Sequence, residues 1–175
     1  MKKKLIFAFI VALLLTPWQM AFAFGANNVT LVPKTVQIEA ASPSAAPRWH
    51  AFGRAIGGVD RPGDLFYIDA TQNPTPIRLT LYLTNTQELR HCYSYLILKV
   101  RVYVEGNAGE WEKASWQGEL IPDAFITLHN GQVGFALANN ANYKVTIDGG
   151  SFYCITVSAD GGSISPQFHL TAEQA

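Results

Sequence analysis

The stretch Ile77–Thr84 reads Ile-Arg-Leu-Thr-Leu-Tyr-Leu-Thr, a strict alternation of apolar and polar side chains. A period of two places successive side chains on opposite faces of a β-strand, so this stretch predicts a strand with one face in a core. The run His91–Val104 continues the alternation, and its apolar positions share one parity: Leu96, Leu98, Val100, Val102 and Val104. We therefore expect both stretches to be half-buried strands.

Short β-prone segments and turn residues continue toward the C-terminus. Glu110–Gln117 is predicted to be a strand, and Phe125–Leu137 a hairpin whose Asn130-Gly131 pair supplies the positive φ angles of the turn. Asp148–Gly150 and Asp160–Gly162 predict two further turns, because aspartate and glycine both tolerate left-handed backbone. About nine short strands predict an all-β fold, an antiparallel β-sandwich of immunoglobulin-like or jelly-roll type.

The N-terminus has the pattern of a signal peptide. Lys2, Lys3 and Lys4 precede the eleven apolar residues Leu5–Leu15, and Ala21-Phe22-Ala23 has the small-x-small form of a cleavage site. Eleven residues are too few for a membrane span, which needs roughly 20. We expect cleavage after Ala23 and a secreted, extracellular or periplasmic mature chain without a membrane span.

Composition narrows the class of protein. The whole chain has 13 basic and 13 acidic residues among 175, with 15% charged and 49% apolar residues. These values argue against a nucleic-acid binder and against a disordered chain. The predicted signal peptide holds three of the basic residues and no acidic one, so the mature 152 residues carry a formal charge of −3.

Residues 24–175 are expected to form one domain. Within it, residues 24–64 comprise N-terminal strands and a connection rich in proline, glycine and alanine, and residues 65–175 comprise the sandwich. In an oxidising compartment two cysteines of one domain most often pair, which predicts a disulfide between Cys92 and Cys154. Unpaired or intermolecular cysteines are the alternative.

Two stretches resemble known sandwich families. The interval from Cys92 to Cys154 is similar to that between the inter-sheet cysteines of immunoglobulin-like domains, although Phe152 stands where that family has tyrosine. Arg61–Asp64 followed by Ile77–Asn85 resembles a pattern of secreted bacterial sandwich modules, among them surface-fibre subunits of the TasA/camelysin type. Both resemblances imply a fold more than an activity.

Motifs for catalysis or metal binding are missing from the sequence. It contains no Gly-x-Ser-x-Gly elbow, no phosphate-binding glycine loop and no His-Glu-x-x-His pattern. We therefore expect no enzyme, no catalytic residues and no cofactor. Five aspartates could suggest calcium, but their spacing matches no calcium loop, so turn formation is favoured over a metal site; these are Asp60, Asp64, Asp69, Asp148 and Asp160.

Three tryptophans remain in the mature chain, Trp49, Trp111 and Trp116, and exposed rings of this kind could stack on a glycan. The N-terminal strands offer a different use. Val29–Ala40 is β-prone and precedes the long connection Ala41–Asp64, so it could complete either its own sheet or that of a neighbouring subunit.

The leading hypothesis is a secreted, non-catalytic structural or adhesive component of an extracellular surface or appendage. Its expected partners are copies of itself or other surface proteins, joined by exchange of N-terminal strands. The first alternative is a carbohydrate- or ligand-binding module that uses Trp49, Trp111 or Trp116. The second alternative is a periplasmic enzyme of unrecognised type.

Overall fold

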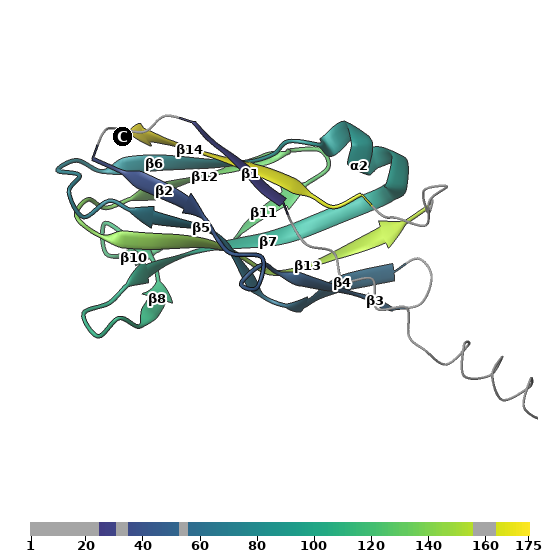
Figure 1. Ribbon diagram of the computed structural model, residues 1–175, viewed down its shortest axis with the longest axis horizontal. Coiled ribbons are helices and arrows are strands. Elements are labelled where there is room, and N and C mark those ends of the chain that lie inside the picture. The colour runs from purple at the N-terminus through teal and green to yellow at the C-terminus, as the bar shows by residue number, and fades with distance from the viewer. Residues whose placement is uncertain (1–24, 31–34, 53–55, 156–163) are drawn as a thin grey trace, which may run out of the picture.

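Two β-sheets pack face to face in the computed structural model, which describes residues 25–30, 35–52, 56–155 and 164–175. Figure 1 shows the two layers, with the short helix α2 (Thr86–Cys92) at one end and strands β8 and β10 projecting at the other. The fold is therefore an all-β sandwich, as the sequence predicts. None of the helices in the described ranges is long and apolar enough to cross a membrane.

The smaller sheet has four strands in the order β1-β14-β6-β12. Their bounds are Gly25–Thr30, Gln167–Gln174, Ile77–Leu83 and Gln132–Leu137. Strand β6 pairs antiparallel with both β14 and β12, whereas β1 lies parallel to β14 at one edge. The N-terminal strand thus completes the sheet of its own chain.

The larger sheet is built on two long strands, β7 (Tyr93–Glu105) and β13 (Asn142–Cys154), which pair antiparallel. On its other side β7 pairs with β11 and β8, and β13 pairs with β4 and β5. The remaining bounds are β2 Gln37–Ala40, β3 Arg48–Phe52, β4 Ile56–Arg61, β5 Gly63–Asp69, β8 Trp111–Lys113 and β11 Ala124–Thr127. A separate ribbon pairs β9 (Ser115–Trp116) with β10 (Glu119–Leu120).

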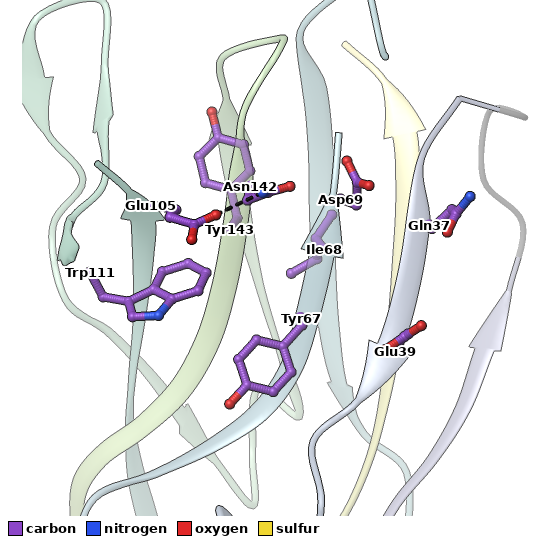
Figure 2. Close-up of a pocket in the computed structure, with 9 residues that line it drawn as sticks. All are labelled: Gln37, Glu39, Tyr67, Ile68, Asp69, Glu105, Trp111, Asn142 and Tyr143. Carbon is purple, nitrogen blue, oxygen red and sulfur yellow. Dashed lines mark hydrogen bonds between the residues drawn. The ribbon is translucent and has the colours of Figure 1, made fainter. Parts of the chain in front are cut away.

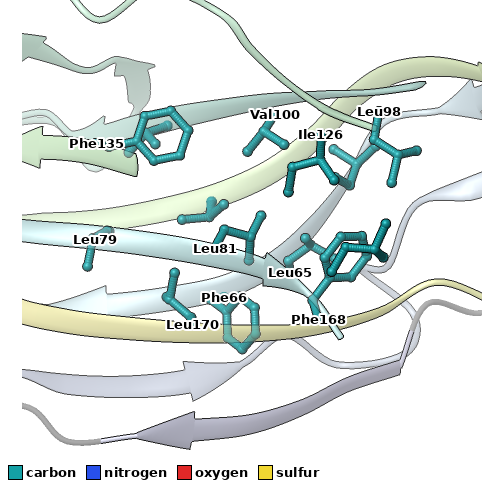
Figure 3. Packing of buried hydrophobic residues seen from close by; sticks show 14 of the residues in the cluster. Leu65, Phe66, Leu79, Leu81, Leu98, Val100, Ile126, Phe135, Phe168 and Leu170 are labelled. Atoms are coloured by element: carbon teal, nitrogen blue, oxygen red, sulfur yellow. The ribbon is translucent and has the colours of Figure 1, made fainter. Parts of the chain in front are cut away.

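The core lies between the two sheets, and the alternation read from the sequence fills it. Ile77, Leu79 and Leu81 are fully buried, as are Leu98 and Val100 on the facing sheet. Figure 3 shows Leu79, Leu81, Leu98 and Val100 in one cluster with Phe168 and Leu170 of the C-terminal strand. Burial of apolar surface contributes roughly 25 cal/mol per Å², so this contact is the main source of stability.

One predicted strand begins later than expected. Residues 86–92 form helix α2, and β7 starts only at Tyr93. Leu89 and Cys92 are buried on one face of the helix, three residues apart, and Glu88 in the first turn and Arg90 in the last match the helix dipole. The buried positions of this segment follow helical spacing, so it forms a helix, and the alternation typical of a strand begins only after it.

Two predicted turns are also corrected. Asp148–Gly150 is not a turn, because β13 runs through it with a bulge between Ile147 and Gly149. The predicted Phe125–Leu137 hairpin is wrong as well, since β11 pairs with β7 in one sheet and β12 with β6 in the other. The chain changes sheets here, and Gly131 supplies the positive φ of 59° at the corner. The predicted turn at Asp160–Gly162 lies outside the described residues.

Strands are more numerous and start earlier than predicted. Fourteen strands are described instead of about nine, partly because several are only two to four residues long. The segment 41–64, expected as a connection, contains β3 and β4, which pair with each other and extend the larger sheet.

The predicted disulfide between Cys92 and Cys154 is not present: both residues are described, and they are not bonded to each other. The immunoglobulin-like interpretation requires the two cysteines in different sheets. Here Cys92 is the last residue of helix α2, directly before β7, and Cys154 ends β13 opposite Tyr93 of β7, so the two cysteines do not come from two facing sheets. The backbone N–H of Ile155 donates to the carbonyl of Cys92 at 2.8 Å, which places the two chain segments edge to edge.

The bulge in β13 generates a first prediction. Gly150 has φ 151°, and a Cβ there would lie 2.5 Å from the carbonyl oxygen of Ile97. We expect Gly150→Ala to lower the free energy of unfolding by about 2 kcal/mol or more. Gly134→Ala is the matched control, since its Cβ would meet nothing closer than 3.6 Å. Chemical denaturation of both variants measures the effect, and equal stability of the two would contradict it.

Candidate binding site

A cleft of about 310 Å³ opens on the larger sheet where β13 begins and β5 and β7 end. Figure 2 shows its side chains spread across five strands, from Trp111 on β8 to Gln37 and Glu39 on β2. The residues that line it are Gln37, Glu39, Tyr67, Ile68, Asp69, Glu105, Trp111, Asn142 and Tyr143. Ligand sites in proteins are commonly clefts of this size with aromatic walls and a few polar groups.

Strand register brings these residues together in two rows. In the first row Gln37 lies opposite Asp69, Asp69 opposite Asn142, and Glu105 opposite Trp111. In a β-sheet, directly opposite residues on one face are close enough for their side chains to interact. The second row runs beside the first, with Glu39 opposite Tyr67 and Tyr67 opposite Lys144.

Aromatic rings form one wall of the cleft. The ring centroids of Trp111 and Tyr67 are 6.2 Å apart, and their planes are tilted by 47°. The ammonium group of Lys144 lies 5.0 Å from the centroid of Trp111 and 5.6 Å from that of Tyr103. At these distances a cation is attracted by the ring faces. Lys144 therefore holds the Trp111 ring against the sheet.

Asp64 fixes the base of this wall. The hydroxyl of Tyr67 donates to Oδ2 of Asp64 at 2.6 Å, and Nζ of Lys144 lies 3.2 Å from Oδ1 of the same carboxylate. The hydrogen bond to Asp64, together with burial and the negative charge, raises the pKa of Tyr67 to about 12. The phenol is thus a committed donor, and the aromatic wall is ordered before any ligand arrives.

Three carboxylates, Glu39, Asp69 and Glu105, line the cleft and are exposed to solvent. Oε2 of Glu105 accepts a hydrogen bond from the side-chain amide of Asn142 at 2.7 Å. Hydrogen bonds from the hydroxyl and the backbone N–H of Thr71 lower the pKa of Asp69. Within the described part of the chain, none of the three carboxylates is in an ion pair.

A network of ion pairs anchors strand β8, which carries Trp111. The guanidinium of Arg101 binds Asp123 through two hydrogen bonds of 2.9 and 2.8 Å, and Lys113 lies 3.0 Å from the same carboxylate. Asp148, at the bulge of β13, accepts from Arg101 at 2.7 Å and from Lys99 at 3.1 Å. Because Lys113 follows Trp111 by two residues on β8, this network fixes the strand beneath the aromatic wall.

The three candidate tryptophans do not form one site. Trp111 lines the cleft. Trp116, on β9, is half-buried and packs against the hydrophobic core. Trp49 lies on β3, where its backbone is opposite Val59, and its side chain is not described.

The aspartates considered for calcium have separate roles. Asp64 and Asp148 are in ion pairs, and Asp69 lies in the cleft. The side chain of Asp60 is not described, and Asp160 lies outside the described residues. In the parts of the chain that are described, no three His, Cys, Asp or Glu residues gather as a metal site.

Sequence reasoning predicted Trp111 as a ligand-binding residue, considered Asp69 only for calcium, and missed the other residues of the cleft. Tyr67, Lys144, Glu105 and Asn142 lie far apart in the sequence and meet only through strand register. The signal available was the alternation of polar side chains at the ends of predicted strands.

Comparisons with known proteins identify no family. No family model matches the chain, and no curated protein matches it. The CBM22-1 xylan-binding domain from Paenibacillus barcinonensis Xyn10C is similar with a TM-score of 0.27 and 9% identity, over 89% of this chain and 92% of that one.

Two further solved structures are similar at the same low level. Drosophila melanogaster CENP-C bound to CAL1 has a TM-score of 0.23 and 8% identity, over 69% of this chain and 80% of that one. A family 16 carbohydrate binding module-2 has a TM-score of 0.19 and 12% identity, over 65% and 79%. With TM-scores this low, the likenesses carry no functional argument.

The ionic network generates a second prediction. Arg101 and Lys113 hold the pKa of Asp123 well below its usual range. A carboxylate with a lowered folded-state pKa stabilises the fold above its unfolded pKa of about 4, and the stabilisation is lost as the pH falls. We expect Asp123→Asn to cost about 1–2 kcal/mol at neutral pH.

The difference between Asp123→Asn and the wild type should shrink as the pH falls below about 4, because the Asp123 carboxyl of the unfolded chain takes up a proton there while that of the folded chain stays ionised. Urea denaturation across pH measures it. Glu119→Gln, an exposed carboxylate on β10, is the control and should change nothing. A pH-independent difference would contradict the assigned role of Asp123.

Proposed function

We propose that this chain is an exported, non-catalytic carbohydrate-binding module that takes its ligand in the cleft beside Trp111. The observation that carries the proposal is the ordered aromatic wall of Trp111 and Tyr67, held by Lys144 and Asp64. Export is supported by the basic and apolar N-terminal pattern of residues 1–23.

A sugar ring offers apolar C–H faces and a rim of hydroxyl groups, and the cleft has a surface for each. The rings of Trp111 and Tyr67 provide apolar area at little cost in side-chain entropy. Gln37, Asp69 and Asn142 place polar groups across the floor, on three neighbouring strands. A few polar groups that converge on an aromatic surface are what orients a bound ligand.

Carboxylates beside a sugar site raise the question of hydrolysis. A glycosidase needs one carboxyl group with a raised pKa to act as general acid. The pKa of Asp69 is lowered by Thr71, which favours the ionised form and hydrogen bonding over proton donation. Asp69 therefore does not suit the role of general acid.

The wall generates a third prediction. Trp111→Ala removes the larger ring and should weaken glycan binding by about ten- to a hundredfold, since burial of such a side chain is worth roughly 1.5–3 kcal/mol. A glycan panel screened by tryptophan fluorescence identifies the ligand, and calorimetry on wild type and variant gives the affinities. Reducing-end release should stay at background throughout.

Phe125→Ala is the matched control, because this aromatic residue is 50% exposed on β11 and does not line the cleft. It should bind like the wild type. Thermal unfolding of both variants shows whether each is folded. No response to any glycan, or equal loss in both variants, would refute the proposal.

A second candidate, a structural or adhesive surface component, is favoured by one observation. Among the described strands of its sheet, β1 alone is parallel to its neighbour, and it pairs there with β14, at an edge. An edge strand of this kind can leave its own sheet and complete another copy's. In the structure β1 pairs within its own chain, so exchange between subunits is an additional hypothesis.

Strand exchange generates a fourth prediction. If β1 joins subunits, the mature chain forms oligomers that grow with protein concentration, and deletion of residues 24–30 abolishes them. Sedimentation velocity over a concentration series measures this. Trp111→Ala should leave the oligomers intact, because Trp111 lies on the other sheet. A monomer at every concentration removes this candidate.

A further inference from the structure

The cleft has an unbalanced charge. Glu39, Asp69 and Glu105 contribute three carboxylates, and the described residues that line the cleft include no lysine or arginine. The nearest cation described above, Lys144, is not available to a ligand, because its ammonium lies 3.2 Å from Asp64 and over the rings of Trp111 and Tyr103. A ligand in this cleft therefore meets a net negative field.

The cleft also has more hydrogen-bond acceptors than free donors. Three of the lining donors are already committed: the hydroxyl of Tyr67 to Asp64, the hydroxyl of Tyr143 to the carbonyl of Ala138, and the amide of Asn142 to Glu105. The amide of Gln37 and the indole N–H of Trp111 are further donors in the lining, but the three carboxylates bring more acceptor oxygens than these two groups bring donors. The cleft is suited to a ligand that donates hydrogen bonds.

Asn142 supplies an independent indication. Its Oδ1 atom is buried and has no hydrogen-bond partner among the described residues, although its amide nitrogen is bonded to Glu105. A buried acceptor without a partner costs about 1–3 kcal/mol. Asn142 lines the cleft between Asp69 and Glu105, so a turn of its side chain that brings Oδ1 into the cleft would let a donor on the ligand supply the missing hydrogen bond.

We propose that the sugar chain bound in this cleft is cationic, with free protonated amino groups, as in oligomers of glucosamine. This inference rests on the proposed carbohydrate-binding function and adds the charge of the ligand. An ammonium group donates up to three hydrogen bonds, and its positive charge balances the negative charge of the carboxylates.

The placement of the carboxylates favours a chain over a metal ion. Glu39, Asp69 and Glu105 lie on three different strands. Strand β13 separates β5 from β7, so the backbones of Asp69 and Glu105 are two strand spacings apart, about 10 Å. Calcium needs six to eight oxygens within about 2.6 Å. Spread charge of this kind suits amino groups repeated along a sugar chain, with the rings of Trp111 and Tyr67 against its pyranose faces.

The test compares two sugar chains of equal length, a glucosamine oligomer and its fully N-acetylated, uncharged counterpart. At about pH 5.5, where ordinary carboxyl groups are ionised, calorimetry should show about tenfold tighter binding of the glucosamine oligomer. Raising the ionic strength from about 0.01 to 0.15 M should reduce that preference. Glu105→Gln keeps an acceptor for Asn142 and should lose most of the preference, while Glu119→Gln, outside the cleft, should keep it.

The outcomes separate the two proposals. Equal or tighter binding of the N-acetylated chain overturns the cationic ligand and leaves the carbohydrate-binding function in place. Binding of neither chain, nor of any glycan in the wider panel, overturns both. A lysine oligopeptide of the same charge is the third ligand: if it binds as tightly as the glucosamine oligomer, charge alone is recognised and the amino-sugar assignment is wrong.

Discussion

The antiparallel pairing of β7 with β13 is the interaction on which the rest of the molecule depends. Each strand is thirteen residues long, and they stay paired along almost their whole length. Four other strands attach directly to this pair, β11 and β8 to one side and β5 and β4 to the other. The pairing survives the insertion of Asp148 because Gly150 accepts a backbone conformation and a close approach that other residues cannot.

The bulge that accommodates Asp148 also places its carboxylate beside two basic side chains of β7. Its carboxylate joins Lys99 and Arg101 on the neighbouring strand, and Arg101 in turn binds Asp123. The same two strands end at the cleft, where Asn142 and Glu105 meet. One pair of strands thus provides the core on its inner face and the candidate binding surface on its outer face.

The sequence predicts the fold class because a period of two is a local signal. The alternation in Ile77–Thr84 assigned buried and exposed faces correctly, and Leu98 and Val100 were likewise predicted to be buried. Local signals failed where the same residues fit two kinds of local structure. Asp148–Gly150 is good turn chemistry but also fits a bulge, and only the partner strand β7 decides between them.

The candidate site was predicted in part, for the same reason. Trp111 was identified from its residue type alone. Tyr67 and Lys144 were not, because they come together only through the register of β5 with β13, which shifts at a bulge where Leu65 is the extra residue of β5. The disulfide was predicted from the compartment and the cysteine count, neither of which carries the geometry of the pair: Cys92 ends helix α2 and Cys154 ends β13, and they are not bonded to each other.

The cleft draws its lining from residues 37 to 143, which lie on five strands. No local fragment of the chain can assemble it, since every row of side chains needs partners distant in sequence. The site therefore exists only after the strands of the larger sheet have paired. Such non-local pairing is typical of β-sandwiches and is slow. A ligand held there binds the folded state alone, so occupancy at a hundred times the dissociation constant adds about 2.7 kcal/mol to the stability of the whole domain. Ligand binding in this cleft is therefore thermodynamically linked to the folding of the whole domain.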